Sequence, residues 1–249
     1  VWSLERSVDG RLWCGTLPGG LFVSSDGAQS WQLVEGLWNR PERLGWFGGG
    51  YPEPGIHSIC PHPTDAADLL VAVSCAGVWR SRDAGVSWQV HCKGLRADFL
   101  PPEQAEDPNG QDPHRVQRCA AAPEVLWMQH HCGIWRSDDH AQVWRELRVQ
   151  PSSFGFAVAA HPSDPNTAWF APAVKDMQRV PVDGALCVTR TRDGGHSFEV
   201  LREGLPQQHC YDLVYRHGLE VAADGQTLLM GSTTGNLWTS FDAGNHWQH

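Results

Sequence analysis

One eight-residue pattern recurs five times along this chain at nearly even spacing. It has Ser or Thr first, Asp third, usually Gly fifth, and Trp or Phe eighth, as in "SRDAGVSW" from Ser81 to Trp88. The other copies are "SSDGAQSW", "SDDHAQVW", "TRDGGHSF" and "SFDAGNHW". With starts at 24, 81, 137, 191 and 240, successive copies lie 57, 56, 54 and 49 residues apart. A period near fifty predicts a chain built from repeated units.

Each repeat consists of short strand-like segments separated by turn signals. The second repeat is the clearest, with "IHSICPHP", "DLLVAVS", "GVWRS" and "SWQVHC" as strands and "RDAG" as a hairpin turn. No segment has ten residues of helical apolar periodicity. The sequence therefore predicts an all-β fold, a β-propeller of four-stranded antiparallel blades, with five blades visible. We expect a single domain over 1–249, with blades at approximately 1–36, 56–94, 114–149, 154–203 and 211–249.

The residues that recur in the pattern have structural roles in a hairpin. An Asp side chain in a turn can accept hydrogen bonds from backbone N–H groups two residues on, and Gly at the fifth place tolerates positive φ. The final Trp returns on the fourth strand and buries a large ring against its own hairpin. We therefore predict that five aspartates are structural: Asp26, Asp83, Asp139, Asp193 and Asp242.

This S-x-D-x-G-x-x-W frame resembles the Asp-box (or BNR) repeat of sialidases, sortilin-type receptors, xyloglucanases and photosystem II assembly-factor propellers. Ala28 and Ala141 stand where Gly is usual, and Thr191 and Phe198 are conservative replacements. The resemblance implies the fold, but not an activity, because those relatives differ in what they do. Propellers of this family more often have six to eight blades, so the chain could be part of a larger ring.

Charge and apolar patterning limit the possible partners. The net charge is −9, with no Lys/Arg run, which argues against nucleic acid or an anionic membrane. The longest apolar stretches, such as "FGFAVAA", are strand-sized, so no membrane span is expected. Eight cysteines without a CxxC motif indicate buried thiols and favour a cytoplasmic setting. Since the chain begins without Met, secretion stays open.

Long loops are expected on one face of the propeller. In an up-and-down blade, the Asp turns and the "HPTD" and "HPSD" turns share the opposite face, which makes His62 and His161 structural. The long loops would place a ligand site at the top of the central channel. Its candidate residues are His57, His114, Arg115, His130, His131, Lys175, Arg179, His209 and Tyr211. We expect a glycan or an anionic small molecule there, because Arg suits carboxylates and loop aromatics such as Phe47 and Tyr51 suit sugars.

Two other functions stay open. The first is glycoside hydrolysis, for which Asp112, Asp176, Asp212 and Tyr211 are the available groups, Tyr211 or Tyr215 being near Arg216. The Arg-Ile-Pro motif of sialidases is not visible. The Gly-rich segment before "VSCAGVWR" is similar to a xyloglucanase first blade, but Ser74 and Cys75 stand where that family has its Asp. The second is a scaffold that binds a protein partner through an exposed apolar patch.

A metal is the remaining option for the loop histidines. His57, His130 and His131 could bind zinc or another divalent ion, although no ligand spacing typical of zinc sites is present. No cofactor is otherwise predicted. The segment "YDLVYRH" is expected to form an inner strand, with Tyr211 and Tyr215 on one side and Asp212 and Arg216 on the other.

Overall fold

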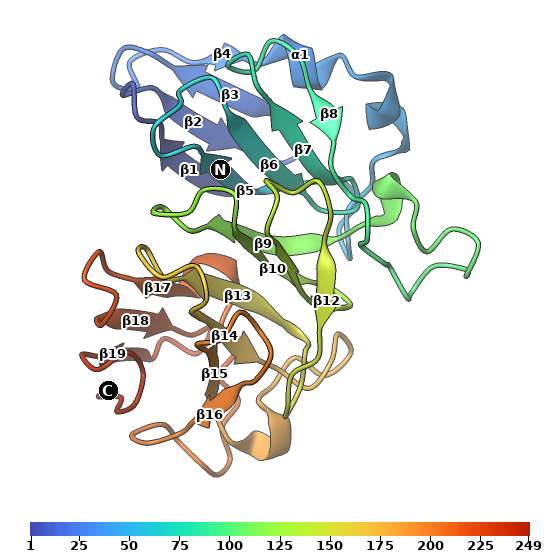
Figure 1. Ribbon diagram of the computed structural model, residues 1–249. Coiled ribbons are helices and arrows are strands. Elements are labelled where there is room, and N and C mark those ends of the chain that lie inside the picture. The colour runs from blue at the N-terminus through green and yellow to red at the C-terminus, as the bar shows by residue number, and fades with distance from the viewer. The chain divides into compact units, whose positions relative to one another are not determined.

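The computed structural model describes residues 1–249 and contains nineteen short strands, β1 to β19, with almost no helix. The strands form five antiparallel sheets, and strands that follow one another in sequence lie side by side in each (Figure 1). Four sheets have four strands and the fifth has three. The fold is therefore an all-β, five-bladed propeller, as the sequence predicts. Each sheet is called a blade below.

The first two blades contain strands β1 to β8. Blade 1 consists of β1 (Ser3–Arg6), β2 (Leu12–Gly15), β3 (Leu21–Ser24) and β4 (Gln32–Leu33). Blade 2 consists of β5 (Ile56–Pro61), β6 (Leu69–Val73), β7 (Gly77–Ser81) and β8 (Gln89–Val90). The link between them carries helix α1 (Glu35–Trp38) and the 3-10 turn η1 (Pro41–Gly45). The four strands predicted in the second repeat are confirmed.

The other three blades follow in the same order. Blade 3 consists of β9 (Pro113–Arg118), β10 (Leu126–His130), β11 (Gly133–Ser137) and β12 (Arg145–Leu147), after the 3-10 turn η2 (Pro108–Gly110). Blade 4 consists of β13 (Gly155–Ala160), β14 (Ala168–Pro172), β15 (Val188–Thr191) and β16 (Glu199–Leu201), with η3 (Val182–Gly184) inside its long loop. Blade 5 consists of β17 (Leu219–Val221), β18 (Leu228–Gly231) and β19 (Leu237–Ser240), after η4 (Arg216–Gly218).

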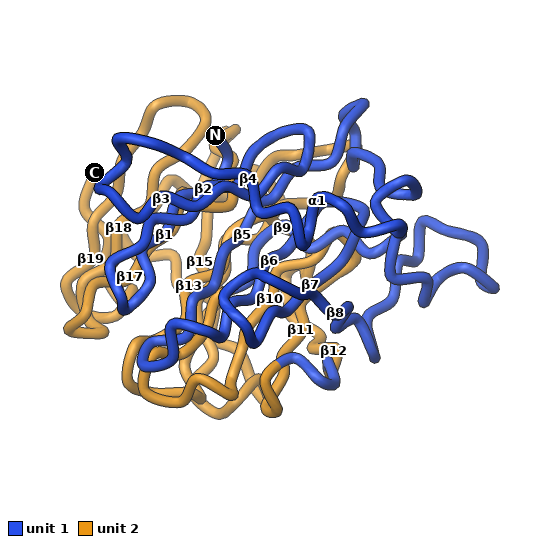
Figure 2. Tube along the Cα trace, turned by 90° about the horizontal axis from the view of Figure 1, so that it is seen from above, with its two compact units in different colours: residues 1–116, 141–144 blue, residues 117–140, 145–249 orange.

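The chain divides into two compact units, which Figure 2 colours separately. Unit 1 comprises residues 1–116 and 141–144, and unit 2 comprises residues 117–140 and 145–249. The short segment 141–144 belongs to unit 1 because Trp144 is held there by two hydrogen bonds. Its backbone N–H donates to the Lys93 carbonyl at 2.8 Å, and its indole N–H donates to the His91 carbonyl at 2.9 Å. A single domain over 1–249 stays a prediction.

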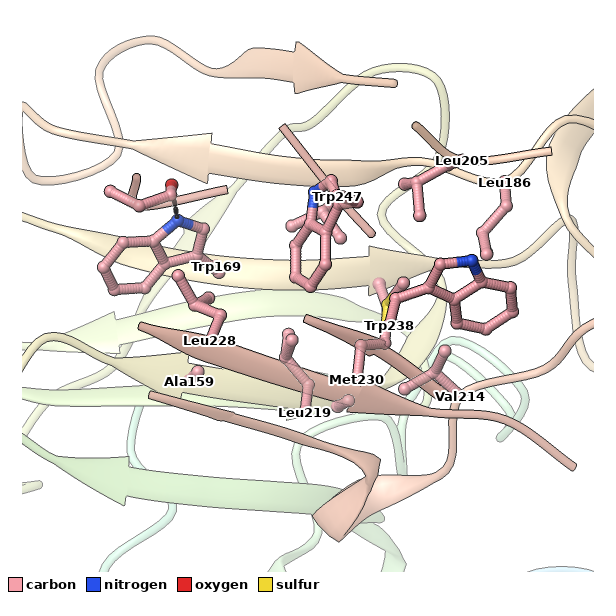
Figure 3. Close-up of a cluster of buried hydrophobic side chains, with 14 of the residues drawn as sticks. Ala159, Trp169, Leu186, Leu205, Val214, Leu219, Leu228, Met230, Trp238 and Trp247 are labelled. Carbon is pink, nitrogen blue, oxygen red and sulfur yellow. Dashed lines mark hydrogen bonds between the residues drawn. The ribbon is translucent and has the colours of Figure 1, made fainter. Parts of the chain in front are cut away.

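Tryptophan dominates the apolar core of each unit. In unit 1, Trp13, Trp79 and Trp88 pack with the aliphatic residues of β5 and β6. In unit 2, Trp169, Trp238 and Trp247 pack with residues from blades 4 and 5 (Figure 3). The Trp169 indole N–H donates to the Ala243 carbonyl at 2.8 Å, so its polar atom is satisfied in the core. Burying one such side chain contributes roughly 4–6 kcal/mol by surface area alone.

In four of the Asp turns the aspartate accepts hydrogen bonds from the hydroxyl that opens the turn and from the amide four residues on. Asp26 accepts from the Ser24 hydroxyl at 2.8 Å, from the Ser30 amide at 3.0 Å and from the Ser30 hydroxyl at 2.6 Å. The amide donor is thus four residues on, rather than two as expected from Asp turns in general. These hydrogen bonds, led by that of the Ser30 hydroxyl, lower the pKa of Asp26 to about 2. The Asp26 carboxylate binds donors of its own turn, so its role is structural.

The fifth position of each turn has a left-handed backbone even where Gly is replaced. Gly85, Gly195 and Gly244 have φ of 91°, 88° and 90°, and Ala28 and Ala141 have φ of 71° and 66°. Alanine is strained in this region, and the turn holds it there by a hydrogen bond that turns with glycine share. The Ala28 amide donates to the Ser24 hydroxyl at 3.0 Å, as the Gly85 amide does to the Ser81 hydroxyl at 2.8 Å.

A Gly-Leu pair follows three of the turns, and its glycine allows the next turn to dock. The three pairs are Gly36–Leu37, Gly94–Leu95 and Gly204–Leu205. A Cβ atom on Gly94 would lie 2.2 Å from the Trp144 carbonyl oxygen, and one on Gly204 would lie 1.8 Å from that of Trp247. No side chain fits at these distances. The glycines therefore permit close backbone contact between one blade and the following Asp turn.

Two local predictions are wrong. The segment 211–217 is not a strand; the inner strand of blade 5 starts at Leu219. It is held instead through Asp212, whose side chain accepts hydrogen bonds from Cys210, Ser232, Thr234 and Asn236. The ring of Trp31 is not buried against its hairpin but is 37% exposed, whereas Trp88 and Trp144 are each 2% exposed.

Candidate functional site

Half-exposed polar side chains gather around one phenylalanine of unit 2. We call Phe154, Phe156, Asp176, Arg179, Tyr215 and Arg216 the Phe156 cluster. Phe156 lies in β13 and is only 2% exposed. The rings of Phe154 and Tyr215 meet it edge to face, with centroids 5.4 and 4.8 Å away. This geometry suits the aromatic quadrupole and fixes the Tyr215 ring, which is 38% exposed.

Two guanidinium groups complete the cluster. The Cζ atoms of Arg179 and Arg216 lie 5.3 and 5.5 Å from the Phe156 ring centroid, within the range of cation–π attraction. Arg179 also donates to the Tyr215 hydroxyl at 3.4 Å and forms an ion pair with Asp176 at 2.5 Å. Burial favours the neutral form of Arg179, but its hydrogen bonds with Tyr215 and Asp176 outweigh this and raise its pKa. The guanidinium is thus charged and oriented.

The long loop of blade 4 positions Arg179 in the Phe156 cluster. Its residues form a small hairpin in which the Val174 amide donates to the Val180 carbonyl at 2.9 Å and the Gln178 amide to the Lys175 carbonyl at 3.0 Å. The base of the hairpin is tied to the strand of Phe156, since the Ala173 amide donates to the Phe154 carbonyl at 2.8 Å. Backbone hydrogen bonds therefore hold the loop against the strand of Phe156.

The cluster is locally cationic in a chain of net charge −9. Arg179 and Arg216 of the cluster, together with Lys175 beside it on the hairpin, carry three positive charges, and Asp176 carries one negative charge. The Arg179 and Asp176 side chains are 40% and 35% exposed, so both reach solvent. This arrangement can bind an anionic oxygen at the guanidinium while a sugar face stacks on the Tyr215 ring.

Asp212, a candidate for acid–base chemistry, is a structural acceptor in unit 2. It accepts from Ser232 at 2.6 Å, from Asn236 at 2.8 Å and from the Cys210 thiol at 3.0 Å, and also from Thr234. Burial favours its neutral form, but these hydrogen bonds prevail and lower the pKa to about 2. A general acid must hold a proton near neutral pH, and Asp212 does not.

The other candidates in unit 2 have mixed environments. His130 is fully buried against Trp135, with ring centroids 4.8 Å apart, and its Nδ1 accepts from the Cys132 amide at 3.1 Å. His131 is half-buried and meets Phe154 edge to face at 5.8 Å, so it borders the Phe156 cluster. His209 is exposed with φ of 53°, and Tyr211 is 67% exposed. Lys175 is exposed on the hairpin beside Asp176.

The candidates in unit 1 are more deeply buried. His57 in β5 is 1% exposed and packs against Trp2, with ring centroids 4.5 Å apart. Asp112, His114 and Arg115 are at most 3% exposed, and the His114 Nε2 lies 3.6 Å from an Asp112 carboxylate oxygen. A Cβ atom on Gly49 would lie 2.5 Å from the same oxygen. The loop that carries Phe47 and Tyr51, which are 41% and 57% exposed, therefore covers Asp112.

A metal bound jointly by His57, His130 and His131 stays a prediction. His57 belongs to unit 1 and the other two to unit 2. The carboxylate and imidazole pair of Asp112 and His114 in unit 1 provides two ligand types that divalent metals accept.

Sequence reasoning did not select Phe154 and Phe156 for the site. They stand in "SSFGFAVAA", an apolar inner strand, where an aromatic ring is indistinguishable from core. Tyr215 and Arg216 are adjacent in the sequence, but the role of Tyr215 depends on its contact with Arg179, 36 residues earlier in the chain.

Comparisons with known proteins give the fold and a short stretch of similarity. No protein-family model matches the chain. A curated relative, the oligoxyloglucan-reducing end-specific xyloglucanase of Emericella nidulans, is 32% identical over 85 residues, covering 32% of this chain and 9% of the relative. The chain thus spans a small part of that protein.

The similar solved structures are propeller proteins. The chain aligns over its whole length with 32% of an ancestral GH74 enzyme, with a TM-score of 0.70 and 18% identity. It aligns over 97% of its length with 36% of the GH74 xyloglucanase of Xanthomonas campestris (TM-score 0.62, 16% identity). It aligns over 98% of its length with 65% of YCF48, solved bound to D1 peptide (TM-score 0.57, 15% identity). At these identities the similarity shows the fold.

No helix of this structure could cross a membrane, since the longest helical segment, η1, has five residues.

Proposed function

We propose that this chain is a glycan-binding propeller module that binds a sugar carrying an acidic group at the Phe156 cluster. One observation carries the proposal: the Arg179 guanidinium, oriented by Asp176 and Tyr215, reaches solvent beside the half-exposed Tyr215 ring. The carboxylate of the sugar forms an ion pair with the Arg179 guanidinium, and the apolar face of the sugar stacks on the Tyr215 ring. Similarity to xyloglucanases supports a carbohydrate ligand.

We also propose that the five Asp turns are Asp-box repeats. The shared acceptor role of Asp26, Asp83, Asp193 and Asp242 supports this, since each accepts from the residue that opens its turn and from an amide four residues on. The assignment concerns the scaffold and leaves the ligand to the loops.

Glycoside hydrolysis is the second candidate function, favoured by the xyloglucanase similarity. Hydrolysis needs two carboxyl groups in defined protonation states. In unit 2, Asp176 is ion-paired and Asp212 is saturated by four donors, so neither has an environment that suits a general acid. We therefore place binding ahead of hydrolysis. Incubation with xyloglucan oligosaccharides, followed by measurement of new reducing ends, separates the two functions.

The binding proposal is tested by isothermal titration with galacturonic acid and galactose, which differ only in the carboxylate at C6. We expect galacturonic acid to bind more tightly, and Arg179→Gln to weaken its binding about tenfold or more, as expected for a charge-assisted hydrogen bond. The matched control is Arg96→Gln, because Arg96 is also an exposed arginine ion-paired to a nearby aspartate, Asp98, at 2.7 Å. Equal affinity for the two sugars, or equal effects of the two variants, would refute the proposal.

A further inference from the structure

A polar groove of about 390 Å³ lies in unit 1 beside the second Asp turn. Its lining comes from β7, the turn, β8 and the segment 141–144: Arg80, Arg82, Asp83, Ser87, Gln89, His91 and Gln142. It contains no aliphatic side chain and no Phe, Tyr or Trp, so an apolar ligand has nothing to pack against. The volume falls within the range of small-molecule sites.

The two sides of the groove are fixed to each other. The His91 Nδ1 lies 3.2 Å from the Ala141 carbonyl oxygen, and the Trp144 indole N–H donates to the His91 carbonyl at 2.9 Å. The close approach of Gly94 to Trp144 locks the same two segments together. A ligand therefore meets a preformed groove and does not have to order it.

The charges of the groove leave one cation without a carboxylate partner. Asp68 forms a bidentate pair with Arg80, with hydrogen bonds of 2.9 and 2.5 Å, and this pair is buried. Asp83 accepts from the Ser81 and Ser87 hydroxyls at 2.8 and 2.5 Å and from the Ser87 amide at 2.8 Å. Asp68 is thus paired with Arg80, whereas Asp83 stays ionised and its oxygens are bound by donors of its own turn. Arg82 is exposed and has no carboxylate within ion-pair distance.

The protonation of His91 should depend on whether an anion is bound in the groove. Since a carbonyl oxygen only accepts, the His91 Nδ1 carries the hydrogen and Nε2 has the lone pair in the neutral ring. Burial lowers the pKa of His91, and the nearby charges of Arg80 and Arg82 lower it further, against the hydrogen bond to the Ala141 carbonyl and the charge of Asp68, which raise it. The charged groups that face or border His91 are these three and Asp83. A bound anion would offset the two arginines and favour protonation of Nε2.

We propose that this groove binds the sulfate or phosphate ester group of a small polar molecule, with Arg82 as the ion-pair partner and the Gln89 amide as a donor. The groove is larger than a bare oxyanion, so the remaining volume takes the polar body of the ligand, such as a sugar ring. This site is separate from the Phe156 cluster and does not depend on the function proposed there.

The test follows the His91 ring resonances by NMR in the whole chain. Glucose 6-sulfate, glucose 6-phosphate, sodium sulfate and glucose are titrated at constant ionic strength set with sodium chloride. We expect saturable shifts of His91 with at least one ester, affinity at least tenfold above that for glucose, and a pKa of His91 that rises toward its ordinary value on binding. The ester that binds more tightly identifies the source of the oxyanion.

Arg82→Gln should weaken ester binding tenfold or more. The matched control is Arg192→Gln, because Arg192 occupies the same place in the fourth turn but lies 3.7 Å from Glu199; it should leave binding unchanged. Both arginines are exposed, so both variants should fold, which circular dichroism checks. The proposal is overturned if glucose shifts His91 as strongly as the esters, or if Arg82→Gln binds them as wild type does.

Discussion

The guanidinium of Arg179 donates to the hydroxyl of Tyr215 at 3.4 Å, joining the long loop of blade 4 to the segment that enters blade 5. Both side chains also contact Phe156, Arg179 through its guanidinium and Tyr215 through its ring. A charged group and an exposed aromatic ring are thus held by a buried anchor, which is the arrangement that a ligand site on loops requires.

Asp212 should be the most sensitive carboxylate of unit 2. Asp212→Ala removes the common acceptor of Ser232, Thr234 and Asn236, and we expect a loss of roughly 2–4 kcal/mol of unfolding free energy, because these donors lose their partner in a partly buried place. Urea denaturation followed by tryptophan fluorescence measures this. Asp224→Ala, at an exposed turn of the same blade, is the control and should cost less. Equal losses would contradict the buried role.

The same residue predicts a pH dependence of stability. The pKa of Asp212 is lowered from 3.8 to about 2, so its contribution is complete above the unfolded-state pKa near 4. It is lost as the pH falls through the folded-state pKa near 2. We expect the wild type to lose stability more steeply than Asp212→Asn between pH 4 and 2. Denaturation midpoints at four pH values across this range test it, and parallel curves for the two proteins would show that Asp212 titrates normally.

Two glycines with left-handed backbone should respond differently to the same substitution. Gly204 has φ of 82° and a Cβ there would lie 1.8 Å from the Trp247 carbonyl oxygen, whereas Gly27 has φ of 73° and no atom within 4 Å. Gly27→Ala should cost about 1 kcal/mol, the usual cost of backbone strain. Gly204→Ala adds a backbone clash and should cost several times more or prevent folding. Melting temperatures of the two variants measure this difference. Similar values would show that the contact between Gly204 and the Trp247 carbonyl is not rigid.

The cysteines give a test of the buried core. None of the eight forms a disulfide, and seven are buried, with only Cys132 half-buried. Burial raises the pKa of Cys92 to about 12 and, with the hydrogen bond to Asp212 next, that of Cys210 to about 11, so neither forms a thiolate near neutral pH. We expect Ellman's reagent to label about one thiol per native chain and eight in denaturant. Rapid labelling of several native thiols would contradict the packing.

The sequence predicts the fold well because the fold depends on local chemistry. The spacing of five Asp turns and the short apolar runs in "DLLVAVS" and "GVWRS", bounded by turn residues, are enough to place strands and hairpins. Two further local signals are present in the sequence. Ser30, Ser87 and Ser197 stand at the seventh place of their turns and donate to the aspartate, and the Gly-Leu pairs mark where one blade meets the next turn.

The site was predicted only in part, because it depends on contacts between distant segments. The sequence predicts Arg179, Lys175 and His131 at a ligand site, and these residues lie in or beside the Phe156 cluster. Phe156, which anchors the cluster, stands in an apolar strand that the sequence identifies only as part of the core. Tyr211 and Asp212 were expected to point to opposite sides of a strand. Four hydrogen-bond donors instead hold Asp212 in an irregular segment, and nothing in the local alternation predicts them.

The central claim, that the Phe156 cluster binds an acidic sugar, is tested most directly by NMR of the Arg179 side chain and the Tyr215 ring during titration with galacturonic acid. We predict that the Arg179 Nε–H and the Tyr215 ring protons shift together and saturate at one dissociation constant, while galactose leaves the Arg179 signal in place. Saturable shifts confined to residues 47–51 of unit 1, with Arg179 and Tyr215 unmoved, would contradict the account.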